Sequence, residues 1–213
     1  MNALISGEDH KTVFVITPTY TRITQLAELT LLAQALAHVP FLQWIVVEIS
    51  KTSLVSDFLE STNLHFTHLD NGGVMEQGIN KCNVLRNTAL GHLRESHVNS
   101  SGVILFANLD RLYSTELFIK VRDIKKVGIW PTIFAKEQFE CNPLKFNQNI
   151  PKYPINLGSV GFSTALLQTE LTLPPRVSDT DAISQITDAL ISGKEEVEII
   201  SCSDQFVWFI SIF

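Results

Sequence analysis

Short apolar runs alternate with amphipathic stretches along the first 130 residues of the chain. The β-branched and aromatic run Val13–Ile16 predicts a strand that ends where Pro18 interrupts it. Leucine and alanine residues at helical spacing over Arg22–Val39 predict a helix, with a proline just beyond its end. The run Trp44–Ile49 predicts a second buried strand.

The same alternation continues as far as residue 131. Leu64–Leu69 alternates between apolar and polar residues and predicts a strand nearer the edge of a sheet, followed by a turn and a loop. A helix is expected over Val84–Leu93, and a fully buried strand over Gly102–Ala107. Ser114–Ile124 is expected to be a helix that its first serine caps, and Val127–Pro131 a fifth strand.

Strands that alternate with helices in this way predict an α/β fold with a mostly parallel sheet and helices on both of its faces. Ligands of such sheets bind at the carboxyl ends of the strands. Those ends fall here at Thr17–Arg22, Glu48–Lys51 and Asn108–Tyr113. We therefore expect the functional site to be built from these three segments.

The pattern changes after Pro131, where a polar stretch broken by prolines begins. Ser159–Leu167 is apolar again, Ser178–Ser192 has helical spacing, and Gln205–Phe213 predicts a terminal strand. No linker composition separates the two parts, so the change marks two sub-regions of one domain.

Composition excludes several classes of function. The net charge is -6 with the basic residues scattered, which argues against a nucleic-acid partner. The apolar runs are too short for a membrane span. Dinucleotide-binding, P-loop and α/β-hydrolase motifs do not occur in the sequence. His65 and His68 are interpreted as strand residues rather than metal ligands.

The segment FANLDRLY, Phe106–Tyr113, places one carboxylate, Asp110, directly after a buried strand. Asn108 and Leu109 beside it resemble gaps in a longer acidic motif. A carboxylate at a strand end is the position from which α/β proteins usually present chemistry.

The chain resembles the family 43 beta-glucuronosyltransferases. The likeness rests on VFVITPTYTRITQLAELTLLAQALAHVPFLQWIVVE at residues 13–48, and on an RGxxQRN-like segment at Lys81–Asn87. A FADDDNTY-like loop at Phe106–Tyr113 extends it, as does VGFSTALL at residues 160–167. The resemblance covers most of the chain. It implies one GT-A-like domain over residues 1–213, with a nucleotide-sugar half over about 10–131 and an acceptor half over about 132–213.

The activity that this resemblance implies is inverting, UDP-glucuronate-dependent transfer to the proteoglycan linkage region or to related galactose-terminated glycans. Relatives are Golgi type II membrane proteins, and this chain, which begins almost at its first strand, is expected to lack their anchor or to be a fragment. The resemblance also leaves a homodimer open.

Several residues match the family's nucleotide site. Those expected to contact the nucleotide are Pro18, Thr19, Tyr20, Lys81, Arg86 and Asn108, and Asp110 is expected to ligate Mn2+. For Arg86 the alternative is a plain surface cation of its helix. Mn2+ binding is expected to be weakened, because Asn108 and Leu109 replace acids and Arg111 adds a cation. Restoring Asp at positions 108 and 109 is expected to recover some metal dependence.

The acceptor side matches less closely. Asp181 is the candidate catalytic base, and Glu140 and Asn156 are candidate acceptor contacts. Two alternatives remain open beside the transferase: a catalytically impaired pseudoenzyme with at most a weak UDP or glycan pocket, and a sugar-binding module in which Glu140 and Trp130 line a groove.

Overall fold

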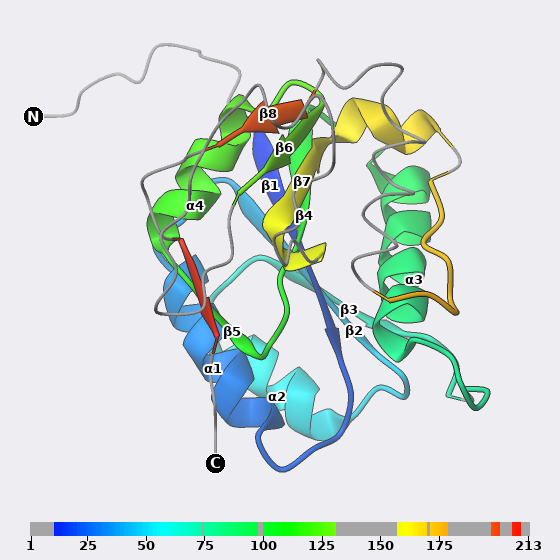
Figure 1. Cartoon of the computed structure of the whole chain (residues 1–213). Helices are drawn as coiled ribbons and strands as arrows, with labels where there is room; N and C mark the ends of the chain where they lie inside the picture. Colours follow the sequence, from blue (N-terminus) through cyan, green and yellow to red (C-terminus); the bar gives the residue numbers. More distant parts are fainter. Residues whose placement is uncertain are drawn as a thin grey trace, which may run out of the picture.

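The computed structural model describes residues 11–73, 75–97, 100–130, 157–169, 171–178, 197–200 and 206–209. These residues form a mixed sheet with the strand order β3-β2-β1-β4-β7-β6-β8, and β5 pairs separately with β9 (Figure 1). The strands are β1 Thr12–Thr19, β2 Leu42–Glu48, β3 Phe66–Asp70, β4 Gly102–Phe106, β5 Arg111–Tyr113, β6 Val127–Ile129, β7 Val160–Ser163, β8 Val197–Ile199 and β9 Val207–Phe209. The helices are α1 Gln25–Leu36, α2 Ser53–Ser61, α3 Lys81–Ser96 and α4 Thr115–Lys120, with 3-10 turns at Val121–Asp123, Leu157–Ser159 and Thr164–Gln168.

Four strands of the sheet run parallel and in close register. β1 pairs with β2 and with β4, and β2 pairs with β3, all in parallel. β7 runs antiparallel between β4 and β6. The α/β class and the mostly parallel sheet predicted from the sequence are confirmed. Figure 1 shows α3 on one face of the sheet and α1, α2 and α4 on the other.

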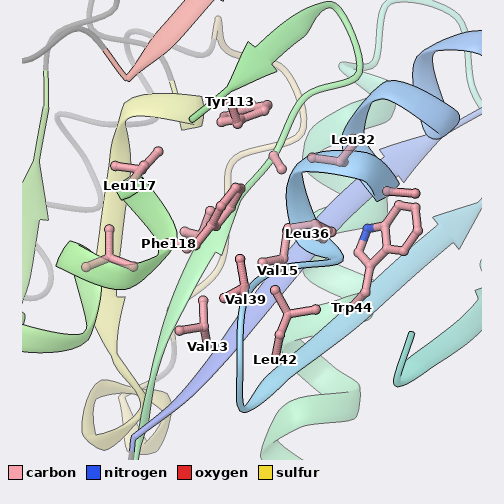
Figure 2. Packing of buried hydrophobic residues seen from close by; sticks show 14 of the residues in the cluster. Val13, Val15, Leu32, Leu36, Val39, Leu42, Trp44, Tyr113, Leu117 and Phe118 are labelled. Atoms are coloured by element: carbon pink, nitrogen blue, oxygen red, sulfur yellow. The ribbon is translucent and has the colours of Figure 1, made fainter. Parts of the chain in front are cut away.

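Each face of the sheet buries its own apolar cluster, because successive side chains of a strand point to opposite faces. Val13 and Val15 of β1 face α1, α2 and α4, whereas Phe14 and Ile16 face α3. Figure 2 shows the first cluster, where Trp44 lies below the leucines of α1. The parallel strands lie between these two apolar layers, and their carboxyl ends meet at one edge of the sheet.

The prediction that the first strand ends at Pro18 is wrong, because β1 continues to Thr19. Ala107 donates its backbone N–H to the carbonyl of Ile16 at 2.9 Å, so the even-numbered residues of β1 direct their backbone groups toward β4. Since β4 ends at Phe106, the ladder on that side has already ended at the level of Pro18. The strand therefore loses no ladder bond to the missing N–H.

Two further elements differ from the sequence prediction. α2 was not predicted, although Thr52 caps it by accepting the N–H of Val55 at 3.4 Å. β5 lies where a loop was expected. The cap at Ser114 is confirmed, since its hydroxyl accepts the N–H of Glu116 at 3.2 Å. Of the helix expected over Ser178–Ser192, only Ser178 is among the described residues, and it is not helical. None of the described helices is long and apolar enough to cross a membrane.

Candidate functional site

The carboxyl ends of β1, β2 and β3 lie side by side. Thr19 pairs with Glu48, and Glu48 pairs with Asp70, so these three residues end their strands at one level. The loop after β4 starts at the same edge, because Ala107 bonds to Ile16. The three segments predicted to build the site are therefore brought together.

Tyr20 is the half-buried residue that follows β1, and two cations approach its ring. The Arg22 guanidinium carbon lies 5.1 Å from the ring centroid, and Lys81 Nζ lies 5.6 Å from it. Lys81 is the first residue of α3, so this contact joins the end of β1 to the start of that helix. Both distances are within cation–π range, so the site combines an aromatic face with positive charge.

Pro18 and Thr19 are buried, unlike Tyr20. The hydroxyl of Thr19 accepts a hydrogen bond from Gln25 Nε2 at 3.0 Å, which directs it into the interior. Of the three residues predicted to contact the nucleotide at this strand end, Tyr20 alone offers a partly exposed side chain.

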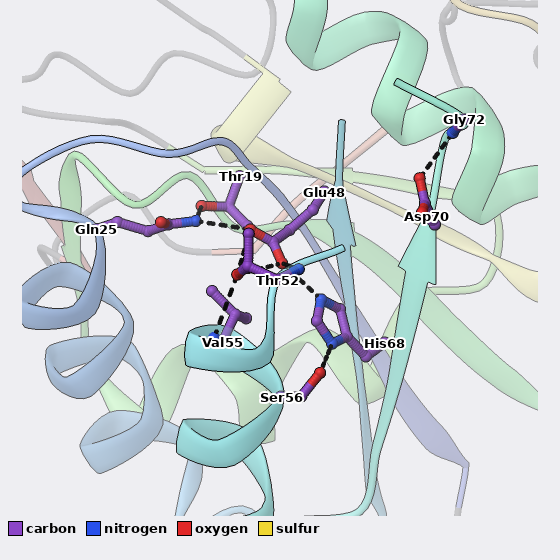
Figure 3. A network of polar contacts seen from close by, with 9 residues as sticks. All are labelled: Thr19, Gln25, Glu48, Thr52, Val55, Ser56, His68, Asp70 and Gly72. Atoms are coloured by element: carbon purple, nitrogen blue, oxygen red, sulfur yellow. Dashed lines mark hydrogen bonds and ion pairs between the residues drawn. The ribbon is translucent and has the colours of Figure 1, made fainter. Parts of the chain in front are cut away.

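A buried carboxylate organises the strand ends (Figure 3). Glu48, 1% exposed, accepts hydrogen bonds from Gln25 Nε2 at 3.1 Å, the Thr52 N–H at 3.0 Å and His68 Nε2 at 2.9 Å. His68 Nδ1 lies 3.1 Å from Ser56 Oγ. Since Nε2 donates to the carboxylate, the neutral ring accepts from the serine hydroxyl through Nδ1. The network joins α1 and α2 to β2 and β3, and it accounts for His68 as a structural residue of β3. His65 lies one residue before that strand.

Burial lowers the pKa of His68 below its ordinary value, and Glu48 acts in the opposite direction. The unfolded chain therefore binds this proton more tightly, so the stability contributed by His68 is complete above about pH 6.5 and is lost as the pH falls below it. We expect the free energy of unfolding to fall less steeply between pH 7 and pH 5 in His68→Gln than in the parent, as urea titrations would measure. Parallel slopes in the two proteins would contradict this role.

Arg86 lies in the interior at 1% exposure, so its interpretation as a surface cation is wrong. Its Nη1 donates to Asn83 Oδ1 at 2.7 Å, and its Nη2 donates to Asn108 Oδ1 at 2.6 Å. The guanidinium carbon also lies 5.4 Å from the centroid of the Phe106 ring. Arg86 therefore links α3 to the loop that follows β4.

The loop after β4 presents little for a metal ion to bind. Asn108 already gives its amide oxygen to Arg86, and Leu109 is only 3% exposed. The side chain of Asp110 is 58% exposed, but Arg111 Nη1 lies 3.6 Å from its Oδ2. No group of three or more His, Cys, Asp or Glu side chains that could hold a metal occurs in the described part of the chain. These donors do not fit a divalent-metal site.

Leu109 belongs to the apolar cluster beneath α1 and α4. An aspartate at this position would place a carboxylate in that cluster, at a cost of several kcal/mol unless it found a partner. An aspartate at position 109 would therefore point into the core rather than toward a metal ion, contrary to the expectation that it would help to restore metal binding.

The N-cap asparagine of α3 and two asparagines in its first two turns hold the segment 171–177 against the helix, a feature that sequence analysis missed. Asn80, Asn83 and Asn87 recur at a spacing that places them on one face of a helix, and this spacing was the available signal. Their Nδ2 atoms donate to the carbonyls of Val177 at 3.2 Å, Pro174 at 3.0 Å and Leu173 at 2.9 Å, respectively. The chain is thus fixed along α3 shortly before the region that contains Asp181. Asp181, Glu140 and Asn156 themselves lie outside the described residues, and their roles stay predictions.

Solved structures with the same fold are glycosyltransferases of the GT-A class. Staphylococcus aureus TarS, residues 1–349, superposes with a TM-score of 0.62 at 14% identity, over 93% of this chain and 60% of that one. Mycobacterium tuberculosis glucosyl-3-phosphoglycerate synthase, solved with Mn2+ and UDP-glucose, gives a TM-score of 0.57 at 11% identity, over 89% and 68%. The fold of this chain is GT-A.

The sequence comparisons identify the family. The model of glycosyltransferase family 43 matches residues 32–210. Human galactosylgalactosylxylosylprotein 3-beta-glucuronosyltransferase 1 is 40% identical over 138 residues, which cover 58% of this chain and 41% of that relative. Human galactosylgalactosylxylosylprotein 3-beta-glucuronosyltransferase 2 is 32% identical over 225 residues, covering 92% and 68%. The chain belongs to glycosyltransferase family 43. It matches about two fifths of the length of the first of these relatives. Both of these relatives carry the names of transferases.

Proposed function

We propose that this chain forms the donor-binding part of an inverting glucuronosyltransferase that takes UDP-glucuronate and a galactose-terminated glycan, such as the proteoglycan linkage region. One observation carries the proposal. Arg86 joins α3 to the loop after β4, at the sheet edge where Lys81 approaches Tyr20. An aromatic face and cations at the carboxyl edge of a parallel sheet suit a base attached to a diphosphate.

The roles follow from the chemistry of the groups. Tyr20 offers a ring on which a uracil can stack, and Lys81 on the first turn of α3 supplies positive charge for the phosphates. In the transfer, the acceptor hydroxyl oxygen bonds to the anomeric carbon of glucuronate while the bond from that carbon to the UDP oxygen breaks. A carboxylate takes the hydroxyl proton, and UDP leaves. We propose Asp181 for that carboxylate, with Glu140 and Asn156 as contacts to the acceptor.

Family membership also supports a Golgi location, a homodimer, and a division into a nucleotide-sugar half over about 10–131 and an acceptor half over about 132–213. For Mn2+, which solved GT-A structures hold together with UDP-glucose or GDP-mannose, the loop after β4 supports at most a weakened contribution. The carboxylate of Asp110 is the side chain of that loop best placed for it, because it is the exposed one.

The test of this function is binding of UDP and UDP-glucuronate by calorimetry, followed by an assay for UDP released in the presence of a galactose-terminated acceptor. We expect Tyr20→Ala to weaken UDP binding about tenfold or more, because base stacking on an aromatic ring contributes about 1–3 kcal/mol. A matched control is Phe41→Asn, which removes an exposed aromatic side chain before β2, at the opposite edge of the sheet. Asparagine suits its φ of 50°. Equal loss of affinity in both variants, or none in Tyr20→Ala, would reject the proposed site.

A further inference from the structure

We propose that the loop Asn108–Arg111 accepts the diphosphate of its ligand without a divalent cation, with resident guanidinium groups supplying the charge that a metal would supply. This inference rests on the proposed function, since it concerns the same nucleotide site. It departs from the solved GT-A structures that contain Mn2+.

The first observation concerns the direction of the Asn108 amide. Its Oδ1 accepts from Arg86 Nη2 at 2.6 Å, and a guanidinium can only donate, so the oxygen must face Arg86. The same residue's backbone N–H donates to Tyr113 Oη at 2.7 Å, which fixes the start of the loop. The amide oxygen that could coordinate a cation is therefore used inside the protein, and the Nδ2 group that remains repels one.

The second observation concerns Asp110, the exposed carboxylate of the loop. Arg111 Nη1 lies 3.6 Å from Asp110 Oδ2, close enough to neutralise much of its charge. A metal ion at Asp110 would approach a fixed cation at short range. Divalent ions such as Mn2+ prefer several oxygen ligands, and this loop offers a single carboxylate that is already paired.

The balance of charge supports the same conclusion. The loop itself carries one carboxylate, Asp110, and the guanidinium groups of Arg111 and Arg86 lie beside it and behind it. Lys81 adds a further cation near Tyr20 on the same edge. At the loop, a diphosphate therefore meets more guanidinium than carboxylate charge before any metal arrives. Preformed positive charge is what a leaving diphosphate requires from its site.

Calorimetric titration of the parent chain with UDP tests this directly, once in EDTA and once with saturating MnCl2. We expect the two dissociation constants to differ by less than about threefold, since a metal gains little at a paired carboxylate. Electron paramagnetic resonance of Mn2+ gives a second measure. We expect a sample of UDP with the protein to contain no more bound Mn2+ than a sample of UDP alone. UDP binding that is tenfold or more tighter with Mn2+ would overturn the inference.

The variant Asp110→Asn gives opposite signs under the two mechanisms. If Asp110 only pairs with Arg111, removing the carboxylate should strengthen UDP binding in EDTA several-fold, because one repulsive charge is gone. If Asp110 holds a metal, the same variant should abolish a Mn2+-dependent component. Asp110 is exposed, so the change leaves the core intact, and thermal unfolding checks this.

Two variants of Arg111 test its charge and its planar guanidinium separately: Arg111→Asn removes the positive charge, and Arg111→Lys keeps the charge without the guanidinium. Arg111→Asn should weaken UDP binding in EDTA about fivefold and make Mn2+ helpful, whereas Arg111→Lys should stay within about threefold of the parent. Absence of UDP binding under every condition would reject the proposed function together with this inference. Binding that requires Mn2+ would reject the inference alone.

Discussion

Replacing Arg86 with methionine is expected to weaken UDP binding at least about tenfold and to lower the free energy of unfolding by about 2–4 kcal/mol. Methionine fills a similar volume but donates no hydrogen bond. Asn83 Oδ1 and Asn108 Oδ1 would lose donors at 2.7 and 2.6 Å, and Asn83 is fully buried. The loss of the second bond would release the loop that carries Asp110.

The control for this change lies about two turns further along the same helix. Arg94 donates through Nε to the carbonyl of Leu167 at 3.2 Å and through Nη2 to the carbonyl of Leu171, and neither acceptor belongs to the loop after β4. Arg94→Met should therefore destabilise the fold while leaving UDP affinity unchanged. Arg86→Lys should recover only part of the loss, because one ammonium cannot reproduce the planar fork that spans two asparagines.

Urea unfolding and UDP calorimetry on the three variants give the comparison. If Arg86→Met and Arg94→Met lose stability equally and both retain UDP binding, Arg86 is a packing residue and does not position the loop.

The parallel strands could be predicted because their apolar runs are long enough to be buried on both faces. Phe14 and Val15 of β1 meet different helices, so neither face of the strand tolerates polar residues. The extension of β1 through Pro18 could not be predicted from the run itself. It depends on β4 ending at Phe106, a fact of the three-dimensional register.

α2 shows the limit of periodicity in short helices. Val55 and Leu59 are its buried residues, and the rest of the segment is partly or fully exposed. The four apolar residues of α2, Leu54, Val55, Phe58 and Leu59, span only six residues, which is too short a stretch for periodicity to identify a helix. The cap at Thr52 was present in the sequence, but a threonine is common outside helix caps as well.

The part of the candidate site that directly follows the strands could be predicted from the sequence. Tyr20 and Asp110 follow β1 and β4, and both are exposed enough to meet a ligand. The burial of Arg86 was not predictable from charge, because an arginine is normally placed at the surface. What holds it inside is a pair of amide acceptors, Asn83 and Asn108, that lie far apart in the sequence.

Removing the carboxylate of Glu48 is expected to lower the free energy of unfolding by about 3–5 kcal/mol, because several buried donors lose their acceptor at about 1–3 kcal/mol each. In Glu48→Ala, donors from Gln25, Thr52 and His68 would all lose their common acceptor. The residue is 1% exposed, so water cannot readily replace it without opening the strand ends. Because Thr52 also caps α2, the start of that helix should loosen with the network.

A control on the same pair of strands separates this effect from ordinary loss of a polar side chain. Gln43 of β2 donates to Thr67 Oγ1 of β3 at 2.9 Å in a partly exposed position, so Gln43→Ala should cost less than about 1 kcal/mol. Glu48→Gln keeps the shape and one acceptor oxygen, and should fall between the two. Urea titrations at pH 7 would measure all three free energies, and hydrogen exchange would report α2 separately. The network is dispensable if Glu48→Ala proves no more destabilising than Gln43→Ala. A large loss of stability with unchanged exchange in α2 would instead confine the role of Glu48 to the pairing of β2 with β3 through His68.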